Sequence, residues 1–426
     1  MERTRFQKTT LAMALALGWC AVAEAQQSAT APVTSLGPLI VTGTRQSNRT
    51  VEDSLSPIQL LNEDALEHTG KVGLEEILSN VLPSLSLPSQ AGGDLSSIVR
   101  VFTLRGLNPD QVLVLINGKR RHVTSIVNVA GVVATGAEPV DLNMIPVSAV
   151  DHIEVLSDGA AAQYGSDAIA GVINIILKSH DSGGSADMQV GKYYAGDGFN
   201  YQLNGNDGFK LGTDGFLNLS VSIAQQDITN RALPATLTPL YYPGDPRNQL
   251  PAGIVYKGYG IPDSKTQSFA FNTGKPINSD VALYAFGTFA HSFGQNWEGF
   301  RAANNNNNVL ADYPNGFEPR EDIHQQDFGL TVGIKGENLM NWRWDLSSTY
   351  GRNWAPISLE HSVNPTFGLS SPTLFNEGAF TASEFTNNLD FTRSFDTGVF
   401  QAPLGVAWGL EYRSDKYGIT AGELAS

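Results

Sequence analysis

The chain has 426 residues, 43 of them glycine, and a formal net charge of −15 at pH 7. This acidic balance, with a single short basic run, argues against nucleic acid as a partner. The only cysteine is Cys20, which lies in a leader-like segment, so the rest of the chain can form neither a disulfide framework nor a thiolate metal site nor a thiol nucleophile.

Residues 1–25 predict a secretory signal peptide. A basic start precedes an apolar run, and Ala23 and Ala25 form an A-x-A cleavage pattern. The run has about 13 residues, fewer than the ~20 that a spanning helix needs, which disfavours a retained anchor. A lipoprotein signal is disfavoured because bulky Trp19 precedes Cys20. We expect the mature chain to begin near Gln26.

Residues 26–50 predict a tether of low complexity. The stretch GPLIVTGTR contains a small apolar island, Leu39, Ile40 and Val41, between a Ser/Thr/Ala/Pro-rich stretch and a polar one. Nothing in this region can bury enough apolar surface to fold alone.

Residues 51–178 predict a compact α+β domain. In GLEEILSNVLPSL one helical face carries only apolar side chains, and the helix should stop at Pro83. The members of this face are Leu74, Ile77, Leu78, Val81 and Leu82. Farther along, IEVLSDGAAAQYGSDAIAGVINIILK predicts a strand, an Asp158-Gly159 turn, a Gly/Ala-rich turn or short helix, and a buried strand from Val172 to Leu177.

A hairpin is predicted in the middle of this domain. Val112 to Ile116 is an apolar strand, and Asn117-Gly118 is a strong short-range hairpin signal. The one basic run of the chain, KRRH from Lys119 to His122, follows directly. We expect this basic run to be a solvated turn.

Beyond Lys178 the chain alternates apolar and polar residues with a period of two. FLNLSVSIA places Leu217 and Val221 on one face and Ser220 on the other, and DFGLTVGIK, NWRWDLSSTY and LGVAWGLEYR repeat the pattern. Each segment has about ten residues, the length of a tilted strand that crosses a bilayer. We count about nine such segments. They lie near 185–194, 200–211, 216–226, 267–274, 281–291, 325–335, 341–351, 385–397 and 403–413.

The connections between these segments favour a membrane barrel. Short turns alternate with long loops near 227–266, 292–324 and 352–384, which is typical of outer-membrane barrels. Aromatic side chains on the outward faces suit a girdle at the lipid interface, and the opposite faces are small or polar, as a water-filled lumen requires. These aromatic residues are Trp342, Trp344 and Trp408. A secreted β-sandwich, the alternative, does not need alternating loop lengths.

The order of these features resembles the TonB-dependent outer-membrane receptors over essentially the whole mature chain. The stretches that carry the resemblance are the island, LRGLNPDQVLVLINGKRR, IEVLSDGAAAQYGSDAIAGVINIILK and the alternating strands. The resemblance implies an α+β plug domain at 51–178, followed at 179–426 by the N-terminal part of an antiparallel transmembrane β-barrel. Family barrels have about 22 strands. Nine is an odd number and too few to enclose a plug, so we expect a truncated chain with an incomplete barrel.

The island resembles the TonB box of this family. An extended apolar segment with unpaired backbone groups can add as a strand to the edge of a partner's sheet. The resemblance names that partner as TonB, with its inner-membrane energising complex. The residues it implicates in binding are Leu39, Ile40, Val41, Thr42 and Gly43. The tether would then lie in the periplasm of a Gram-negative bacterium, and the barrel would contact the lipid of the cell outer membrane.

The implied function is energised uptake of a scarce solute of the siderophore-iron, cobalamin or oligosaccharide class. A passive outer-membrane channel or surface-binding protein is an alternative, although a porin needs neither a plug nor a donor strand. A secreted soluble enzyme or adhesin is another. The sequence contains no H-E-x-x-H or G-x-S-x-G motif, and its seven histidines show no metal-ligand spacing. We therefore expect no catalytic residue, metal site or cofactor.

One departure from the family pattern concerns the contact between plug and barrel. Many members carry Arg-Gly-Pro after IEVL, where the arginine is thought to pair with barrel carboxylates, whereas this chain has Ser157-Asp158-Gly159. Arg105 of the LRG motif is the candidate replacement, paired with a lumen-facing carboxylate such as Glu411, because a buried unpaired arginine is costly. The alternative is an exposed arginine in a turn.

Overall fold

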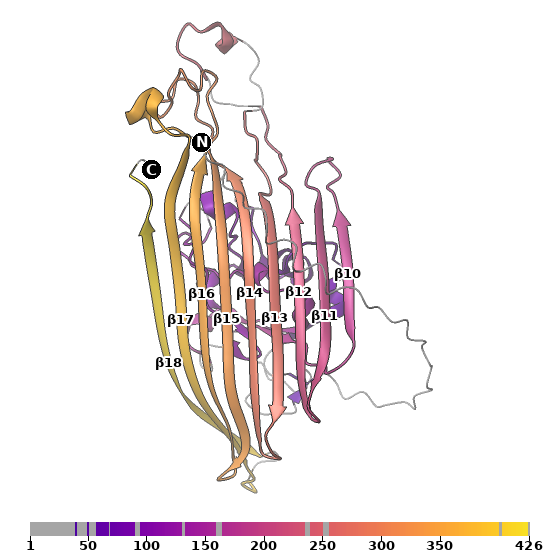
Figure 1. Cartoon of the computed structure of the whole chain (residues 1–426). Coiled ribbons are helices and arrows are strands. Elements are labelled where there is room, and N and C mark those ends of the chain that lie inside the picture. The colour runs from indigo at the N-terminus through magenta and orange to yellow at the C-terminus, as the bar shows by residue number, and fades with distance from the viewer. Residues whose placement is uncertain are drawn as a thin grey trace. The chain divides into compact units, whose positions relative to one another are not determined.

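The structure is a computed structural model. It describes residues 39–40, 49–50, 57–67, 69–89, 94–129, 133–158, 164–234, 239–249, 255–399 and 403–424. The chain divides into Met1–Pro38, none of which is among the described residues, and one compact unit, Leu39–Ser426. This unit contains an α+β domain, called here the N-terminal domain (residues 57–178), and a nine-stranded sheet (Figure 1). In the described part of the chain no helix is long and apolar enough to span a membrane.

The N-terminal domain is built on a five-stranded mixed sheet. Its strands, in spatial order, are β3 (Ile58–Asn62), β8 (Val150–Leu156), β9 (Gly171–Leu177), β6 (Val112–Ile116) and β7 (Lys119–Arg120). Only β6 and β9 run parallel. Every residue of β6 is buried, as expected for a continuous apolar strand covered on both faces. The predicted strands at 112–116 and 172–177 are confirmed.

Two predicted local features of this domain are also confirmed. The helix α2 (Leu74–Val81) buries Leu74, Ile77 and Leu78 on one face and ends before Pro83. Asn117 and Gly118 have φ values of 48° and 78°, the positive pair that a tight hairpin turn between β6 and β7 requires. The turn delivers Lys119–His122 to the side of the domain that faces the nine-stranded sheet.

Shorter elements complete the domain. They are α1 (Glu63–Glu67), the paired strands β4 (Leu85–Ser86) and β5 (Thr103–Leu104), and the 3₁₀ segments η2 (Asp94–Ser97), η3 (Pro109–Gln111), η4 (Leu142–Met144), η5 (Val147–Ala149) and η6 (Ser166–Ala168). N-terminal to the domain, β1 (Leu39–Ile40) pairs with β2 (Arg49–Thr50).

The nine-stranded sheet is an antiparallel meander in which each strand pairs with the next one along the chain. Its strands are β10 (Gly184–Gly191), β11 (Asn200–Leu211), β12 (Gly215–Gln226), β13 (Asp263–Pro276), β14 (Val281–Trp297), β15 (Arg320–Leu339), β16 (Trp342–Glu360), β17 (Leu374–Phe395) and β18 (Leu404–Ala421). The sheet is open, with β10 and β18 as its edges. The predicted nine strands are confirmed, but the later ones are longer than predicted, up to 22 residues in β17. Their pairing continues into segments that the sequence pattern assigns to loops. The loops include the 3₁₀ segments η7 (Pro246–Gln249) and η8 (Pro365–Ser370).

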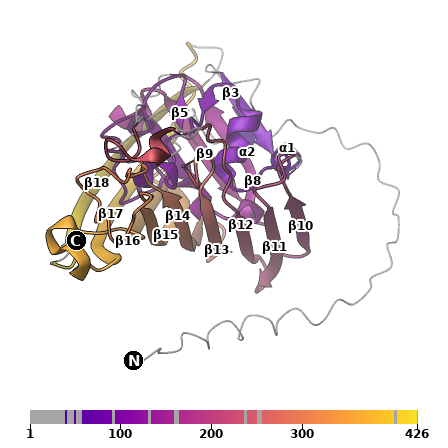
Figure 2. The same ribbon diagram turned by 90° about the horizontal axis from the view of Figure 1, so that it is seen from above.

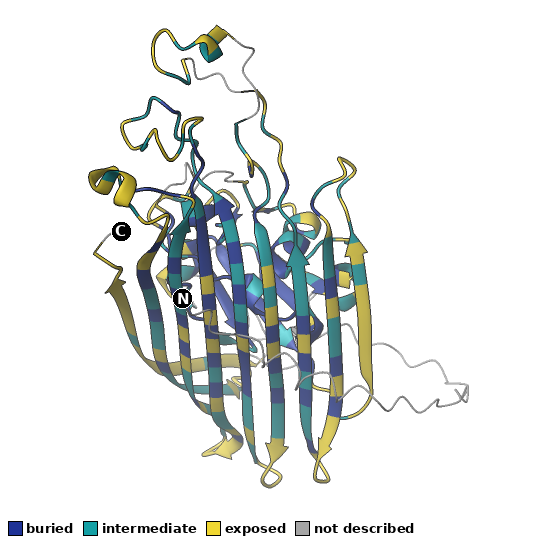
Figure 3. Ribbon diagram, turned by 45° about the horizontal axis from the view of Figure 1, so that its top comes forward, coloured by how far each residue is buried: buried dark blue, intermediate teal, exposed yellow. Residues whose placement is uncertain are grey.

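The alternation along these strands is the reverse of that in a soluble sheet. Ser220 of β12 is 3% exposed, whereas its apolar neighbour Val221 is 39% exposed. Figure 3 shows the same banding of buried and exposed residues along the strands. The polar face lies against the N-terminal domain, which sits on one side of the curved sheet (Figure 2), and the apolar face points away. This arrangement is that of a barrel wall with a lipid-facing exterior, and it contradicts a β-sandwich with one buried apolar face.

Aromatic residues gather on the outward face near the short-turn end of β16, β17 and β18. The rings of Phe391 and Trp408 stack at a centroid distance of 4.3 Å, and Trp342 contacts Trp408 edge to face at 6.3 Å. Such a cluster suits the predicted interfacial girdle.

Candidate functional site

The predicted partner-binding segment is only partly described. Leu39 pairs with Thr50 and Ile40 with Arg49, so the backbone at these two positions is paired within the chain, where an unpaired extended segment was expected. Val41, Thr42 and Gly43 lie outside the described residues.

The structure does not bring together the two residues predicted to join the domain to the wall. Arg105 is exposed, and its Nη1 donates to the carbonyl oxygen of Ser157 at 2.8 Å, within the N-terminal domain. Glu411 on β18 accepts a hydrogen bond from Nδ2 of Asn388 on β17 at 2.9 Å. Arg105 thus matches the alternative of an exposed arginine in a turn.

The basic run, Lys119–His122, makes the contact instead, and the prediction that it is a solvated turn is wrong. Its four side chains are between 4% and 14% exposed. The Asn117-Gly118 turn holds the run against the inner face of the sheet, where strand residues far along the chain present carboxylates. The run is therefore an electrostatic contact between the domain and the wall.

Lys119 and Arg120 form the outer part of this contact. Nζ of Lys119 lies 2.9 Å from Oδ1 of Asp345 on β16 and 3.6 Å from Oδ2 of Asp390 on β17. Nη1 of Arg120 lies 2.6 Å from Oδ2 of Asp167 in its own domain. The same Asp167 oxygen accepts from Nη1 of Arg413 on β18 at 2.9 Å, so this carboxylate joins the domain to the wall.

Arg121 and His122 form the buried centre. Nη2 of Arg121 forms an ion pair with Oδ1 of Asp327 on β15, and Nη1 donates to Oγ1 of Thr288 on β14 at 2.8 Å. Nε2 of His122 lies 3.0 Å from the second oxygen of Asp327. Burial, with the charge of Arg121 second, lowers the pKa of His122. A neutral ring that donates its Nε2 proton fits this geometry.

Amide and hydroxyl groups complete the buried centre. Asn353 on β16 donates to Oδ2 of Asp327 at 3.2 Å, and its Oδ1 accepts from the backbone N–H of Ser125 at 3.0 Å and from the Ser125 hydroxyl at 2.7 Å. A buried ion pair is tolerated only where its remaining donors and acceptors are satisfied. Asn353 and Thr288 satisfy several of them here.

Two glycines of the wall leave room for these side chains. Gly329 on β15 and Gly351 on β16 face each other in the strand register. A Cβ on Gly329 would overlap with Nη1 of Arg121, and a Cβ on Gly351 would overlap with Nδ1 of His122. The absence of side chains at these two positions leaves a space, called here the glycine window, which the side chains of Arg121 and His122 fill.

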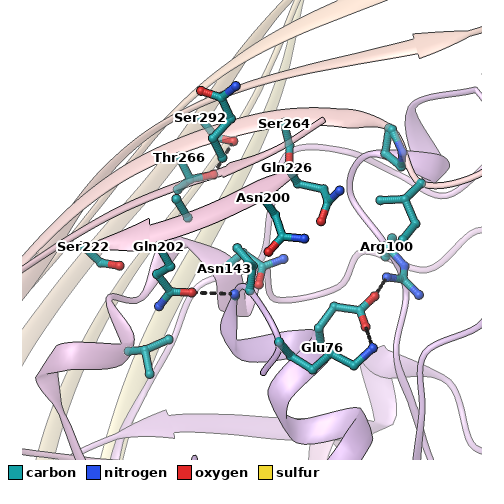
Figure 4. A pocket seen from close by; sticks show the side chains of 18 of the residues that line it. Glu76, Arg100, Asn143, Asn200, Gln202, Ser222, Gln226, Ser264, Thr266 and Ser292 are labelled. Atoms are coloured by element: carbon teal, nitrogen blue, oxygen red, sulfur yellow. Dashed lines mark hydrogen bonds and ion pairs between the residues drawn. The ribbon is translucent and has the colours of Figure 1, made fainter. Parts of the chain in front are cut away.

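A polar cavity of about 270 Å³ lies between the domain and strands β10–β15 (Figure 4). The domain contributes the ion pair of Glu76 and Arg100, and the wall contributes amides and hydroxyls, among them Gln226 and Thr266. Gln202 Oε1 of the wall accepts from the backbone N–H of Gly73 at 3.1 Å. The lining can hold water or a polar solute.

Comparison with known proteins identifies the arrangement. Residues 50–172 match the family model described as the TonB-dependent Receptor Plug Domain. These residues are therefore similar to the plug of TonB-dependent receptors. The N-terminal domain corresponds to that plug, and the nine-stranded sheet has the fold of part of a receptor barrel. This family consists of receptors and transporters.

Individual relatives agree with this assignment. This chain is 27% identical over 341 residues to the vitamin B12 transporter BtuB of Vibrio cholerae, covering 77% of this chain and 45% of that protein. Among solved structures, the siderophore receptor PirA from Acinetobacter baumannii matches with a TM-score of 0.60 at 16% identity, covering 86% of this chain and 49% of that one. The ferric citrate transporter FecA matches with a TM-score of 0.52 at 12% identity, covering 88% and 59%. The chain thus spans about half the length of the relatives it matches.

The glycine window gives a first testable prediction. Gly351→Ala places a methyl group where the His122 ring lies, so we expect it to weaken plug docking by about 1–3 kcal/mol, as overpacking of a filled site usually does. The measurement is the urea concentration at which trypsin first cuts residues 57–178 in detergent-solubilised chain.

Gly418→Ala on β18 is the matched control, because its Cβ would meet only Cβ of Thr381 at 4.0 Å. Equal urea midpoints for the two variants would show that the window does not seat the basic run.

Proposed function

We propose that this receptor carries out energised uptake of a scarce solute across the outer membrane of a Gram-negative bacterium. The observation that carries the proposal is the plug, held against the polar inner face of the wall by the basic run. A wall filled by a locked domain does not leave an open pore, so a solute can pass only if the plug moves or rearranges.

We further propose a division of the chain into four parts. Residues 1–25 are a signal peptide, 26–50 a periplasmic tether, 51–178 the plug, and 179–426 a part of the transmembrane barrel. TonB and its inner-membrane energising complex bind Leu39–Gly43 by strand addition. Because Leu39 and Ile40 pair with residues 49–50 in the structure, TonB has to replace that short pairing when it binds.

The solute is of the class that the relatives' names report. BtuB is a vitamin B12 transporter, PirA a siderophore receptor and FecA a ferric citrate transporter. We propose that the solute is too large or too dilute to be supplied by diffusion through porins. A polar cavity separates the plug from strands β10–β15, and we place the passage of the solute there.

Uptake by whole cells tests this proposal. Cells that produce the receptor receive radiolabelled vitamin B12, ferric citrate or a ferric siderophore, each in a strain with TonB and in one without it. We expect accumulation of at least one solute that requires TonB. Accumulation at the same rate without TonB would instead favour a passive channel, and recovery of the protein in the soluble fraction would favour a secreted protein.

A further inference from the structure

Three carboxylates from three separate segments meet at the long-loop end of β14 and β15. Asp94 begins η2 of the plug, Glu298 directly follows β14, and Glu321 is the second residue of β15. One oxygen from each side chain lies within 4.8 Å of one oxygen from each of the others. The cluster therefore joins the plug to the barrel wall, apart from the basic run.

Two buried oxygens at this cluster have no hydrogen-bond partner among the described residues. One is Oε2 of Glu321, whose side chain is 5% exposed. The other is Oδ1 of Asn296, a fully buried residue that faces Glu321 in the strand register. Nδ2 of Asn296 lies 3.3 Å from Oε1 of Glu298, so this amide reaches the cluster, and exchanging its oxygen and nitrogen directs Oδ1 to the same place. Buried oxygens without a partner are rare unless a water or an ion serves them.

Basic side chains do not neutralise the cluster. Arg301 lies near Glu298, but its Nη1 donates to the carbonyl oxygen of Gly299 at 2.8 Å. Arg320 pairs with Asp322 and Glu360. In the part of the chain that the structure describes, neither arginine forms an ion pair with the three carboxylates, and Glu377 adds a further negative charge nearby. Carboxylates held this close repel one another unless two of them share a proton or a cation lies between them.

We propose that Asp94, Glu298, Glu321 and Asn296 bind a divalent cation of the calcium class, which clamps the plug to the barrel wall. Ca²⁺ takes carboxylate and amide oxygens at about 2.3–2.6 Å, so oxygens on opposite sides of one ion are about 4.8 Å apart. One oxygen from each of the three carboxylates lies within 4.8 Å of the other two, so all three can reach one such ion. Mg²⁺ demands near-ideal octahedral geometry and usually keeps several waters, so ligands from three separate segments favour Ca²⁺.

The surrounding packing positions the plug ligand before any ion binds. Leu95 and Val99, which follow Asp94, join a buried apolar cluster with Ile323 of β15. Oδ1 of Asp94 accepts from the backbone N–H of Leu95 at 2.9 Å, which fixes the carboxylate at the start of η2. Asp327, the partner of the basic run, lies six residues farther along the same strand as Glu321, about 20 Å at 3.3 Å per residue. The ion would thus add a second attachment of the plug, at the end of the wall away from the short turns.

Terbium luminescence tests the site, because Trp297 directly precedes Glu298 and can sensitise a bound Tb³⁺. The receptor chain in detergent is titrated with Tb³⁺, which is then displaced by Ca²⁺ or Mg²⁺. We expect one sensitised site per chain, displaced by Ca²⁺ at much lower concentration than by Mg²⁺. Glu321→Gln and Asp94→Asn should each weaken Ca²⁺ binding at least tenfold, because each removes one charged ligand.

Glu337→Gln is the matched control, since it makes the same change on the same strand at the exposed opposite end. It should bind Ca²⁺ as the unaltered chain does. Three results would overturn the proposal: no sensitised site, Ca²⁺ affinity unchanged in Glu321→Gln, or Ca²⁺ affinity unchanged in Asp94→Asn, which would remove the plug from the site. If Glu321→Gln fails to fold, Asp94→Asn, which changes a half-buried residue at the start of η2, decides alone.

Discussion

We expect Asp327→Asn to be among the most destabilising single changes in the contact between plug and wall. The substitution keeps the shape of the side chain but leaves the buried guanidinium of Arg121 without its counter-charge and removes an acceptor from His122. Breaking a buried pair by removing one partner costs about 3–5 kcal/mol, more than the pair itself contributes. This is a drop of about two to three and a half orders of magnitude in the docking equilibrium.

The measurement is the urea dependence of trypsin cleavage within the plug, compared with Asp312→Asn in the exposed loop after β14. The double variant Arg121→Met/Asp327→Asn should recover part of the loss, because it no longer leaves a buried unpaired charge. If Asp327→Asn behaves like Asp312→Asn, the basic run does not hold the plug.

The second large effect concerns coupling to TonB. Ile40→Pro removes a backbone donor and fixes φ, so we expect it to prevent addition of residues 39–43 to the edge of a partner's sheet. Binding of the purified C-terminal domain of TonB, measured by titration calorimetry, should weaken at least tenfold. Solute binding to the receptor should be unchanged. Among the described residues, Leu39 and Ile40 take no part in the contact between plug and wall.

Ile40→Val is the control, since it keeps the backbone donor and the β-branched side chain. Energised uptake at unaltered rates in Ile40→Pro would contradict the assignment of residues 39–43 as the TonB box. Proline at position 40 also disrupts the pairing with Arg49 within the chain. Tighter TonB binding in Ile40→Pro would therefore mean that this internal pairing, and not strand addition, determines the affinity for TonB.

Local patterns predicted the fold because each depends on residues that are neighbours in the sequence. The helical spacing of Leu74, Ile77 and Leu78 and the alternation around Ser220 are visible within about ten residues. The orientation of the wall also follows from local pattern, since an apolar face flanked by aromatic residues and opposed by hydroxyls and amides suits lipid on one side and water on the other.

The contact between plug and wall could not be predicted in this way. Lys119 and Arg121 find their carboxylates 226 and 206 residues away, and no local rule connects positions so distant. A basic run after a tight turn is usually solvated, so the local pattern pointed to the wrong environment. One feature of the sequence does indicate this contact. Acidic residues such as Asp327 and Asp345 lie on the wall face whose other members are small or polar, and buried carboxylates there need a positively charged partner.

The family pattern calls for an arginine near that end of the plug, and Arg105 is the arginine that the sequence offers there. Its backbone has a φ of 56°, in a turn that directs the side chain to the carbonyl of Ser157 rather than to the wall. The carboxylate cluster could not be predicted from the sequence for a related reason. Asp94, Glu298 and Glu321 lie in three segments that come together only in the folded chain, so no ligand spacing is visible in the sequence.

Protection of a single wall residue tests the central claim, that the plug is seated on the inner face by the basic run. Thr288 is 4% exposed and accepts from Arg121, so Thr288→Cys, in a background in which Cys20 is replaced by serine, reports whether that face is covered. Thr397→Cys, in an exposed turn, serves as the reference. The account predicts that a water-soluble maleimide labels position 397 rapidly and position 288 at least a hundredfold more slowly, until Asp327→Asn is added. Equal labelling of positions 288 and 397 in the otherwise unaltered chain would contradict it.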